Sequence, residues 1–261
     1  MARTTHMGIG AHQDDLEIMA FHGVVECLRN QGRGFLGVVV SDGAGSPRQG
    51  AYAGVTDAQM QEIRNREQEK AATIGGYSAA IILRHPTSAI KDPKNADTDF
   101  DLDKLLESSR PSVVYTHNLA DKHETHVAVA LRAIKAMRRL APGLRPKKVY
   151  GCEVWRGLDW MDDSDKIALD VSGNDDLALS LISAHESQVA GGKRYDLASL
   201  GRRRANATYF AAHDTDKSDM LIYAMDLTPL VIDPSLDISA FVALHLDRFS
   251  RDVARKLAML S

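Results

Sequence analysis

Short apolar segments alternate with longer amphipathic segments along residues 7–155. This pattern predicts strands at residues 7–11, 35–40, 79–83, 112–116 and 149–155, and helices at 16–30, 57–74, 101–109 and 121–140. The run 35–40 is continuously apolar, which is typical of a strand buried on both faces. Because helices separate the strands, the connections are crossovers. We therefore expect an α/β fold with a three-layer α/β/α, Rossmann-like, doubly wound and mostly parallel sheet.

The later part of the chain has a less regular pattern. It predicts a strand at 167–171 and helices at 175–188 and 235–260. Residues 191–217 contain a glycine pair and a basic run, and we expect a long loop or an irregular cap there. Since no linker or internal repeat interrupts the chain, we expect one domain, 1–261, in which the part after about residue 156 shapes the substrate site.

Composition narrows the class of protein. Apolar residues make up 44% and charged residues 26% of the chain, an ordinary balance for a globular enzyme. The formal net charge of -3 argues against nucleic acid as a partner, because phosphate binding needs a basic surface. No apolar run approaches the roughly 20 residues that span a membrane, and residues 1–6 contain no apolar secretion signal. Two cysteines, Cys27 and Cys152, cannot build a disulfide framework, so we expect a cytoplasmic protein.

A first polar cluster follows the first predicted strand. His12, Asp14 and Asp15 lie on a tight turn at the carboxyl end of that strand, where open parallel sheets bind their ligands. The imidazole and one carboxylate suit zinc, which accepts nitrogen and oxygen ligands at about 2.0–2.2 Å. The other carboxylate remains free for proton transfer. The alternative is that Asp14 and Asp15 only cap the following helix.

A second polar cluster follows the fourth predicted strand. It contains His117, His123 and His126 within ten residues. Asp121 and Glu124 fit a capping box, which predicts a helix start at about residue 122 and places His123 and His126 on one helix face. Strands one and four often lie side by side in a doubly wound sheet. The sequence therefore predicts that both clusters form one metal site.

The two clusters resemble the motifs of the PIG-L (LmbE-like) de-N-acetylases, zinc enzymes that deacetylate compounds bearing N-acetylglucosamine and related acylated amines. The family's first motif, Ala/Pro-His-x-Asp-Asp, is matched by residues 11–15, and its second, Asp-x-His-x-x-His, by residues 121–126. Shorter signatures match at Ser41-Asp42-Gly43, at Arg64 and Glu67 before Gly75-Gly76, and at His185-Glu186-Ser187-Gln188. The resemblance is clear over residues 7–135, patchier to 189 and weak beyond.

The resemblance implies a site residue by residue. It implies one zinc ion per chain, held by His12, Asp15 and His126, although other divalent metals stay open. Asp14 is implied as the general base that takes a proton from a metal-activated water, and His123 as a substrate-facing acid or a residue that supports the ligands. Asp121 fits either a role in orienting His123 and supporting the ligands or the capping of the helix, and capping is favoured. The implied substrate is a small N-acylated amino sugar or its conjugate, and the implied reaction is hydrolysis of its N-acetyl group.

The chain departs from the family pattern at two places. Glu124-Thr125 stand between the paired histidines where Pro-Asp is usual, so an aspartate often found beside the second ligand is missing. His22-Gly23 stand where a glycine pair is common on the first helix. Both departures concern the surroundings of the metal and leave the implied ligands in place.

Three further residues are candidates for substrate binding: Asp42, Arg64 and His185. Asp42 is expected to shape the turn after the second strand, beside the metal. Arg64 is expected to bind a substrate hydroxyl or carboxylate, with an exposed pairing to Glu67 or Gln68 on the same helix as the alternative. His185 is expected to face the site, with an ordinary surface histidine as the alternative.

Other candidates are weaker. Arg202, Arg203 and Arg204, with Tyr195, fit either a pocket for a polar or anionic substrate group or a solvated loop, and the loop is favoured. Trp155 and Trp160 fit either stacking on a sugar ring or packing in the core, and packing is favoured.

Two other functions remain as alternatives to the deacetylase. A metal-dependent phosphoesterase needs additional bridging carboxylates, for which Asp42 is the only ready candidate. A non-catalytic metal-binding or sugar-binding protein of the same fold is the other alternative, which the presence of Asp14 beside the ligands disfavours. The sequence leaves open whether the chain forms a homo-oligomer.

Overall fold

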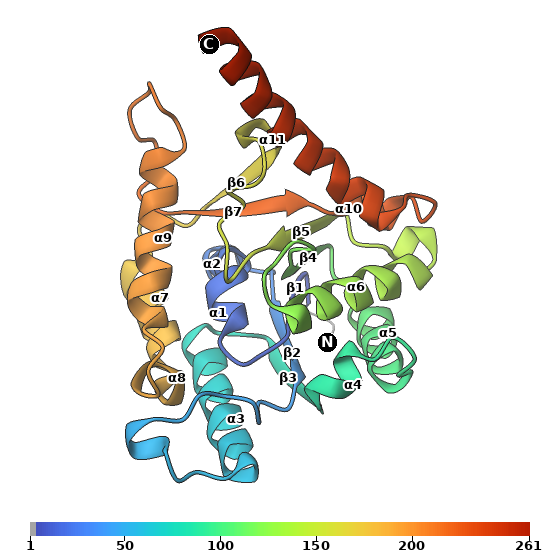
Figure 1. The fold of residues 1–261 in the computed structure, drawn as a ribbon. Helices are drawn as coiled ribbons and strands as arrows, with labels where there is room; N and C mark the ends of the chain where they lie inside the picture. Colours follow the sequence, from blue (N-terminus) through green and yellow to red (C-terminus); the bar gives the residue numbers. More distant parts are fainter. Residues whose placement is uncertain (1–3) are drawn as a thin grey trace.

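The structure, a computed structural model, describes residues 4–261 (Figure 1). Residues 1–3, which contribute to the expectation that no secretion signal is present, lie outside the described residues. The described chain contains a seven-stranded sheet with the order β3-β2-β1-β4-β5-β7-β6. The strands are β1 (His6–Gly10), β2 (Phe35–Ser41), β3 (Ala79–His85), β4 (Val113–His117), β5 (Lys148–Cys152), β6 (Lys166–Asp170) and β7 (Leu221–Asp226).

The direction in which the chain winds changes at β1. Strands β1 to β5 pair in parallel, and β7 runs antiparallel to both β5 and β6. From β1 the chain adds β2 and β3 on one side, then returns to add β4 and β5 on the other. In such sheets the switch point between the two halves, here between β1 and β4, is where ligands bind. The predicted mostly parallel, doubly wound sheet is confirmed, and both polar clusters lie at this one edge.

Helices cover both faces of the sheet. Two buried hydrophobic clusters hold the helices against the sheet. One cluster, which includes Leu16, Val24 and Ala71, lies between one face of the sheet and helices α1, α2, α3 and α7. The other lies between the opposite face and helices α4, α5, α6 and α10. The three-layer α/β/α prediction is therefore confirmed. The helices are α1 (Asp15–Met19), α2 (Phe21–Arg29), α3 (Asp57–Ile74), α4 (Thr87–Lys91), α5 (Asp97–Ser109), α6 (Glu124–Arg139), α7 (Asp175–Ser183), α8 (Glu186–Ala190), α9 (Tyr195–Tyr209), α10 (Thr228–Ile232) and α11 (Ile238–Leu260).

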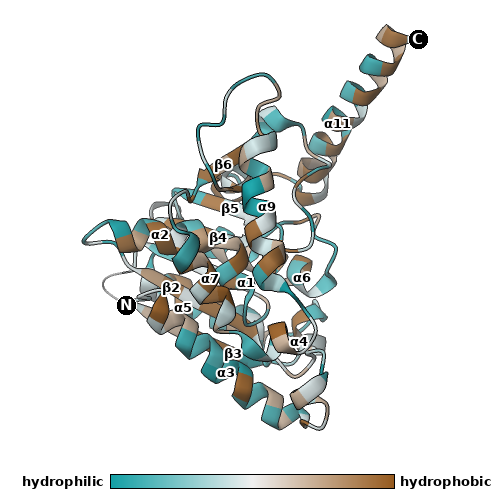
Figure 2. Cartoon of the chain, turned by 90° about the vertical axis from the view of Figure 1, so that its left-hand side faces the viewer, coloured by the Kyte–Doolittle hydropathy of each residue, from teal (hydrophilic) through white to brown (hydrophobic). Residues whose placement is uncertain are grey.

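The longest helices lie at the surface. Helix α3, which carries many charged residues, is largely hydrophilic, and α11 extends away from the sheet toward the C-terminus (Figure 2). Within residues 4–261, no helix combines the length and the apolar character needed to cross a membrane.

Two helices predicted as continuous are each divided in two. The predicted helix 16–30 breaks at Ala20, between α1 and α2. The predicted helix 175–188 breaks between α7 and α8, where His185 has a non-helical backbone and a side chain hydrogen-bonded to Glu17. The prediction of continuity was wrong because hydrophobic periodicity does not record a tertiary contact made by one polar residue.

The prediction of a loop at 191–217 was also wrong, because helix α9 (Tyr195–Tyr209) occupies much of it. Polar anchors hold this helix more than an apolar stripe does. Arg203 is buried and donates from Nη2 to the carbonyl oxygens of Glu17 (2.7 Å) and Ile18 (3.2 Å). Strand β7 was not predicted at all. It lies on the antiparallel side of the sheet, and its neighbour β5 is nearly seventy residues earlier in the chain.

Candidate functional site

The turn after β1 has a strained backbone at Asp14. Its φ of 97° lies in the left-handed region, which side-chain-bearing residues rarely adopt. Asp14 occupies the N-cap position of α1, but its side chain makes no capping hydrogen bond. Asp15 closes the turn instead, because its Oδ2 accepts a hydrogen bond from the backbone N of His12 at 2.6 Å. The Asp14 carboxylate is thus directed to the pocket that it lines rather than to the helix.

The turn after β4 differs from the predicted capping box. Helix α6 begins at Glu124, with His123 as its N-cap residue, and the His123 Nδ1 accepts from the backbone N of Thr125 at 3.3 Å. Asp121 does not cap the helix. Its Oδ1 accepts from the backbone N of His123 at 3.0 Å, and its Oδ2 accepts from Nδ1 of His126 at 3.2 Å. Asp121 therefore fixes the orientation of the His126 ring.

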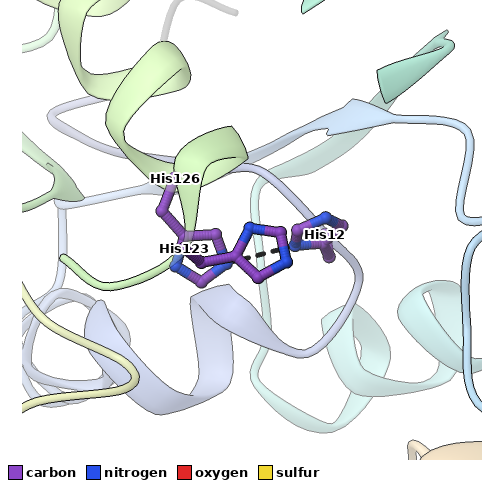
Figure 3. Close-up of side chains that lie close together, drawn as sticks. All are labelled: His12, His123 and His126. Carbon is purple, nitrogen blue, oxygen red and sulfur yellow. Dashed lines mark hydrogen bonds between the residues drawn. The ribbon is translucent and has the colours of Figure 1, made fainter. Parts of the chain in front are cut away.

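Donor atoms from both turns converge at the switch point. His12 Nδ1 lies 3.2 Å from His126 Nε2 and 3.4 Å from Asp15 Oδ2, and His126 Nε2 lies 3.5 Å from Asp15 Oδ1. Figure 3 shows His12, His123 and His126 pointing toward one another from the two turns. Ligands bound tetrahedrally to zinc at about 2.05 Å are separated by about 3.3–3.4 Å. The spacing and the chemistry of these donors, two imidazoles and one carboxylate, therefore fit a zinc ion.

Two more histidines adjoin these donors. Candidate metal-binding groups in the described chain are His12 with His123 and His126, and Asp15 with His117 and His126. His117 stacks on His126 with ring centroids 3.9 Å apart, and its Nε2 accepts a hydrogen bond from the backbone N of Ala11 at 2.8 Å. Because the lone pair of this nitrogen already accepts a hydrogen bond, His117 is less suited to bind a metal and instead packs against the His126 ring. The sequence placed His117 in the second polar cluster at a strand end but gave it no individual role.

Burial and neighbouring charges shift the pKa values in this cluster, and the shifts bear on metal binding. Burial lowers the pKa of His12, which favours the neutral imidazole that a metal needs. Burial opposes ionisation of Asp15, but the His126 and His117 imidazoles outweigh it and hold the pKa of Asp15 well below its usual value. Burial also opposes protonation of His126, but Asp15 and Asp121 outweigh it and raise the pKa of His126. A bound cation would release that proton.

Asp14 differs from Asp15 in its surroundings. Burial raises the pKa of Asp14 to about 7, an effect that Arg64 partly offsets. Arg64 Nη2 lies 3.5 Å from Asp14 Oδ2 and donates to the carbonyl oxygen of Gln13. The alternative of an exposed Arg64–Glu67 pair is wrong, because Arg64 is buried and Glu67 accepts from Ser187 instead.

A pocket of about 460 Å³ surrounds these groups. The predicted residues that line it are His12, Asp14, Asp15, Arg64, His123 and His126. Asp42 and His185 do not line it. Asp42 Oδ1 accepts from the backbone N of Ala44, while Ser41 and Gly43 on either side reach the pocket. His185 is buried, with its Nε2 3.0 Å from Oε2 of Glu17, so it is not the surface histidine of the alternative.

The pocket is also lined by Trp155, Lys193 and Tyr195, to which the sequence assigned no firm role. Trp155 stacks on His123 with ring centroids 6.5 Å apart and meets the Tyr195 ring edge-on at 6.0 Å. Trp155 is half-buried: it packs against a buried hydrophobic cluster, as the favoured prediction had it, and it also lines the pocket. A usable signal was its position just after a strand end, at the same edge of the sheet as the metal ligands.

Solved structures share this fold. A conserved protein from Thermus thermophilus matches with a TM-score of 0.66 and 19% identity over 91% of this chain and 100% of that one. The 4-carboxy-2-hydroxymuconate hydratase GalB from Pseudomonas putida matches at 0.63 and 20%, over 86% and 96%. An N,N'-diacetylchitobiose deacetylase from Pyrococcus horikoshii matches at 0.61 and 16%, over 85% and 84%. These identities establish the fold alone.

The sequence comparison is more specific. A search of curated proteins gave no match. The family described as PIG-L: GlcNAc-PI de-N-acetylase matches residues 7–137, half of the chain. This span contains both turns and every donor atom of the candidate zinc site. The chain therefore belongs to the PIG-L family of GlcNAc-PI de-N-acetylases.

Proposed function

We propose that the protein is a zinc-dependent hydrolase that removes the N-acetyl group from an amino-sugar-like substrate. One observation carries this proposal: His12 Nδ1 and His126 Nε2 lie 3.2 Å apart, each lies within 3.5 Å of one oxygen of the Asp15 carboxylate, and the Asp14 carboxylate lines the same pocket. Membership of the PIG-L family supports it. The fold alone does not, because the hydratase from Pseudomonas putida shares it.

The three donors would hold the zinc ion. A zinc ion with three protein ligands keeps one position for water or substrate, lowers the pKa of that water and polarises a carbonyl oxygen. Asp121 accepts from Nδ1 of His126, so that the lone pair of Nε2 would be available to a bound zinc ion. Asp15 contributes its carboxylate from the first residue of α1, anchored by the backbone N of His12.

Asp14 serves as the general base in this proposal. It is adjacent to a ligand in sequence, is held in place by Arg64 and has no capping hydrogen bond to occupy it. A carboxylate in this position takes a proton from the attacking water and returns it to the departing amine. Arg64 keeps Asp14 oriented, and this contact leaves it less free to bind substrate than was expected from the sequence.

His123 acts as a hydrogen-bond donor. Burial lowers its pKa, with a further contribution from His126, so the neutral form is favoured over the protonated acid implied by the resemblance. Because Nδ1 accepts from the backbone N of Thr125, the ring proton of the neutral form lies on Nε2. This N–H can stabilise negative charge on the carbonyl oxygen of the substrate, an effect commonly worth about 3–4 kcal/mol.

The two alternatives find less support. A two-metal phosphoesterase requires bridging carboxylates between two ions. In the described chain the two candidate donor groups share His126 and so form one cluster, and Asp42 lies outside the pocket. A non-catalytic binding protein has no need of a buried carboxylate, Asp14, held beside the donors by a buried arginine.

The test combines metal content with acetate release from N-acetylglucosamine glycosides. We expect one zinc per chain in the wild type, in Asp14→Asn and in a control, Asp176→Asn, which changes an exposed aspartate on α7. Acetate release should fall at least about 100-fold in Asp14→Asn only, as loss of a general base predicts. If Asp14→Asn retains activity, Asp14 is not the base. If the zinc-loaded wild type releases no acetate, the deacetylase proposal fails.

A further inference from the structure

Helix α11 carries a large part of the exposed apolar surface. In the described part of the chain, seven of the fifteen large apolar side chains that are exposed belong to this one helix. These are Leu244, Leu246, Phe249, Val253, Leu257, Met259 and Leu260. Monomeric proteins rarely expose apolar patches larger than a few hundred Å², and larger patches mark sites of interaction. We therefore examined what α11 could bind.

The body of the protein anchors the N-terminal half of α11. Ile238 and Phe241 pack against the core, and His245 Nδ1 lies 3.1 Å from Asp165 Oδ2. Within residues 4–261, the side chains of 250–261 make hydrogen bonds and ion pairs only with residues of the same helix. Figures 1 and 2 both show this end of α11 projecting from the rest of the chain. Because a helical segment of about a dozen residues is marginally stable without tertiary packing, the projecting end needs a surface to pack on.

The exposed apolar side chains include one regular stripe. Leu246, Phe249, Val253, Leu257 and Leu260 follow one another at intervals of three, four, four and three residues. At 3.6 residues per turn, these positions fall within about 80° of one another around the helix, and we call them the apolar stripe. The intervals are the same in both directions from Val253. Two antiparallel copies of the stripe therefore face each other position by position, with Phe249 opposite Leu257 and Val253 opposite itself.

The charged side chains of α11 favour this antiparallel arrangement. Arg251 and Arg255 lie on the opposite side of the helix from the apolar stripe. Asp252 and Lys256 form an ion pair along one flank of the stripe. In the antiparallel pair, Lys256 lies opposite residue 250 of the second copy, two residues or about 3 Å of helix rise from the second copy's Asp252. Opposite charges of the two copies therefore lie close together on this flank.

A groove beside the apolar stripe enlarges the surface. It has a volume of about 920 Å³ and is lined by Phe249 of α11, by Tyr209 of α9 and by residues of the segment 155–163. Since Phe249 faces Leu257 of the second copy, the end of each helix reaches the groove of the other copy. The eleven residues of 250–260 and the fourteen that line the groove are together as many as the about 20–30 residues that each side of a stable interface contributes.

We propose that α11 binds the α11 of a second copy of this chain, in antiparallel orientation about a twofold axis at Val253. A twofold contact of this kind buries the apolar stripe of both copies at once. The pairing is independent of the proposed function, and it concerns the oligomeric contact that the sequence left open. A lipid surface fits the stripe less well, because four aspartates lie in the segment 159–165 beside α11 and anionic lipids would repel them.

The first test measures the mass of the full chain by light scattering at about 100 µM, above the dissociation constants usual for stable interfaces. We expect the wild type to have twice the mass of Val253→Glu/Leu257→Glu, the stripe variant, which places charge on side chains that are 41% and 64% exposed. The matched control is Leu179→Glu/Leu197→Glu, since these leucines lie outside α11 and are 44% and 60% exposed. The control should keep the mass of the wild type. A cooperative unfolding transition in urea shows that each variant is folded.

The second test uses a short bismaleimide cross-linker to establish the orientation. Val253→Cys should cross-link to a second copy, because this residue lies on the twofold axis. Leu260→Cys should not, since antiparallel pairing separates the two copies of this residue by about 21 Å along the helix. The wild type, whose cysteines are Cys27 and Cys152, gives the background.

Each contrary result has a definite meaning. A wild type with the same mass as the stripe variant would overturn the proposal. If that monomer binds vesicles of phosphatidylcholine and phosphatidylserine and the stripe variant does not, the apolar stripe binds lipid instead. An equal loss of mass in the control would show that the association does not depend on α11, and would also overturn the proposal. Cross-linking of both Val253→Cys and Leu260→Cys would show parallel pairing, and the antiparallel arrangement would be wrong.

Discussion

Asp121 accepts hydrogen bonds from three donors behind the metal ligands, and this makes it a sharp test of the assigned site. Its Oδ2 accepts from Nδ1 of His126 at 3.2 Å and from the backbone N of Val154 at 3.1 Å. Its Oδ1 accepts from the backbone N of His123 at 3.0 Å. A carboxylate is the only side-chain group that presents acceptors, and no donors, at both of its oxygen positions.

The substitution Asp121→Asn keeps the size of the side chain but replaces one acceptor with an NH2 donor. In one orientation this donor faces the backbone N of His123, and in the other it faces both His126 and Val154. Loss of such support for a metal-bound histidine typically lowers metal affinity about 10–100-fold, which is about 1.4–2.7 kcal/mol. We expect the zinc dissociation constant of Asp121→Asn to rise by this factor.

The assay is a competition between the protein and a chromophoric chelator for zinc at neutral pH. Asp101→Asn is the control, because Asp101 Oδ2 pairs with Nε2 of His85 at 2.8 Å outside the metal pocket. We expect zinc affinity to be unchanged in that variant. If Asp121→Asn binds zinc as tightly as the wild type does, either His126 is not a ligand or Asp121 does not orient it.

Three other predictions concern stability, measured as the free energy of unfolding in urea. Gly23→Ala should lower the free energy of unfolding by about 1–3 kcal/mol, because a Cβ at this position would lie 2.6 Å from the Tyr115 ring. An unchanged free energy of unfolding would contradict this packing. Glu17→Gln should lower the free energy of unfolding by about 3–5 kcal/mol, since the substitution leaves His185 without its buried carboxylate partner. A loss of stability below about 1 kcal/mol would refute a buried ion pair between the two residues. For Asp121, burial opposes the charge but the His126 hydrogen bond outweighs it and lowers the pKa to about 2, from 3.8 in the unfolded chain. The ionised carboxylate therefore stabilises the fold above pH 3.8, and this contribution is lost as the pH falls toward 2. The pH profile of Asp121→Asn should be flatter in that range, and a profile identical to that of the wild type would contradict the shift.

The order of strands and helices through β5 could be predicted from the sequence. Buried parallel strands are continuous apolar runs, and this local signal identified β2 without knowledge of its neighbours. The residues of both strand-end turns were also identified, because the carboxyl edge of a parallel sheet is fixed by chain direction. His12, Asp15 and His126 were selected as ligands through the family resemblance, and the structure brings them together.

Only the tertiary structure decided which polar residues face the pocket and which support it. Local spacing favoured Asp121 as a helix cap over a role behind the ligands, but in the structure its carboxylate accepts hydrogen bonds from Nδ1 of His126 and the backbone N of His123. Likewise, α9 was predicted as a loop because no apolar stripe marks it in the sequence. Hydrogen bonds from Arg203 to the carbonyl oxygens of Glu17 and Ile18 hold the helix in place, and these residues lie more than 180 positions away in the chain. Hydrophobic periodicity records how each segment buries its own apolar side chains. Hydrogen bonds between distant polar groups leave no such period, so they become visible only once the chain is folded.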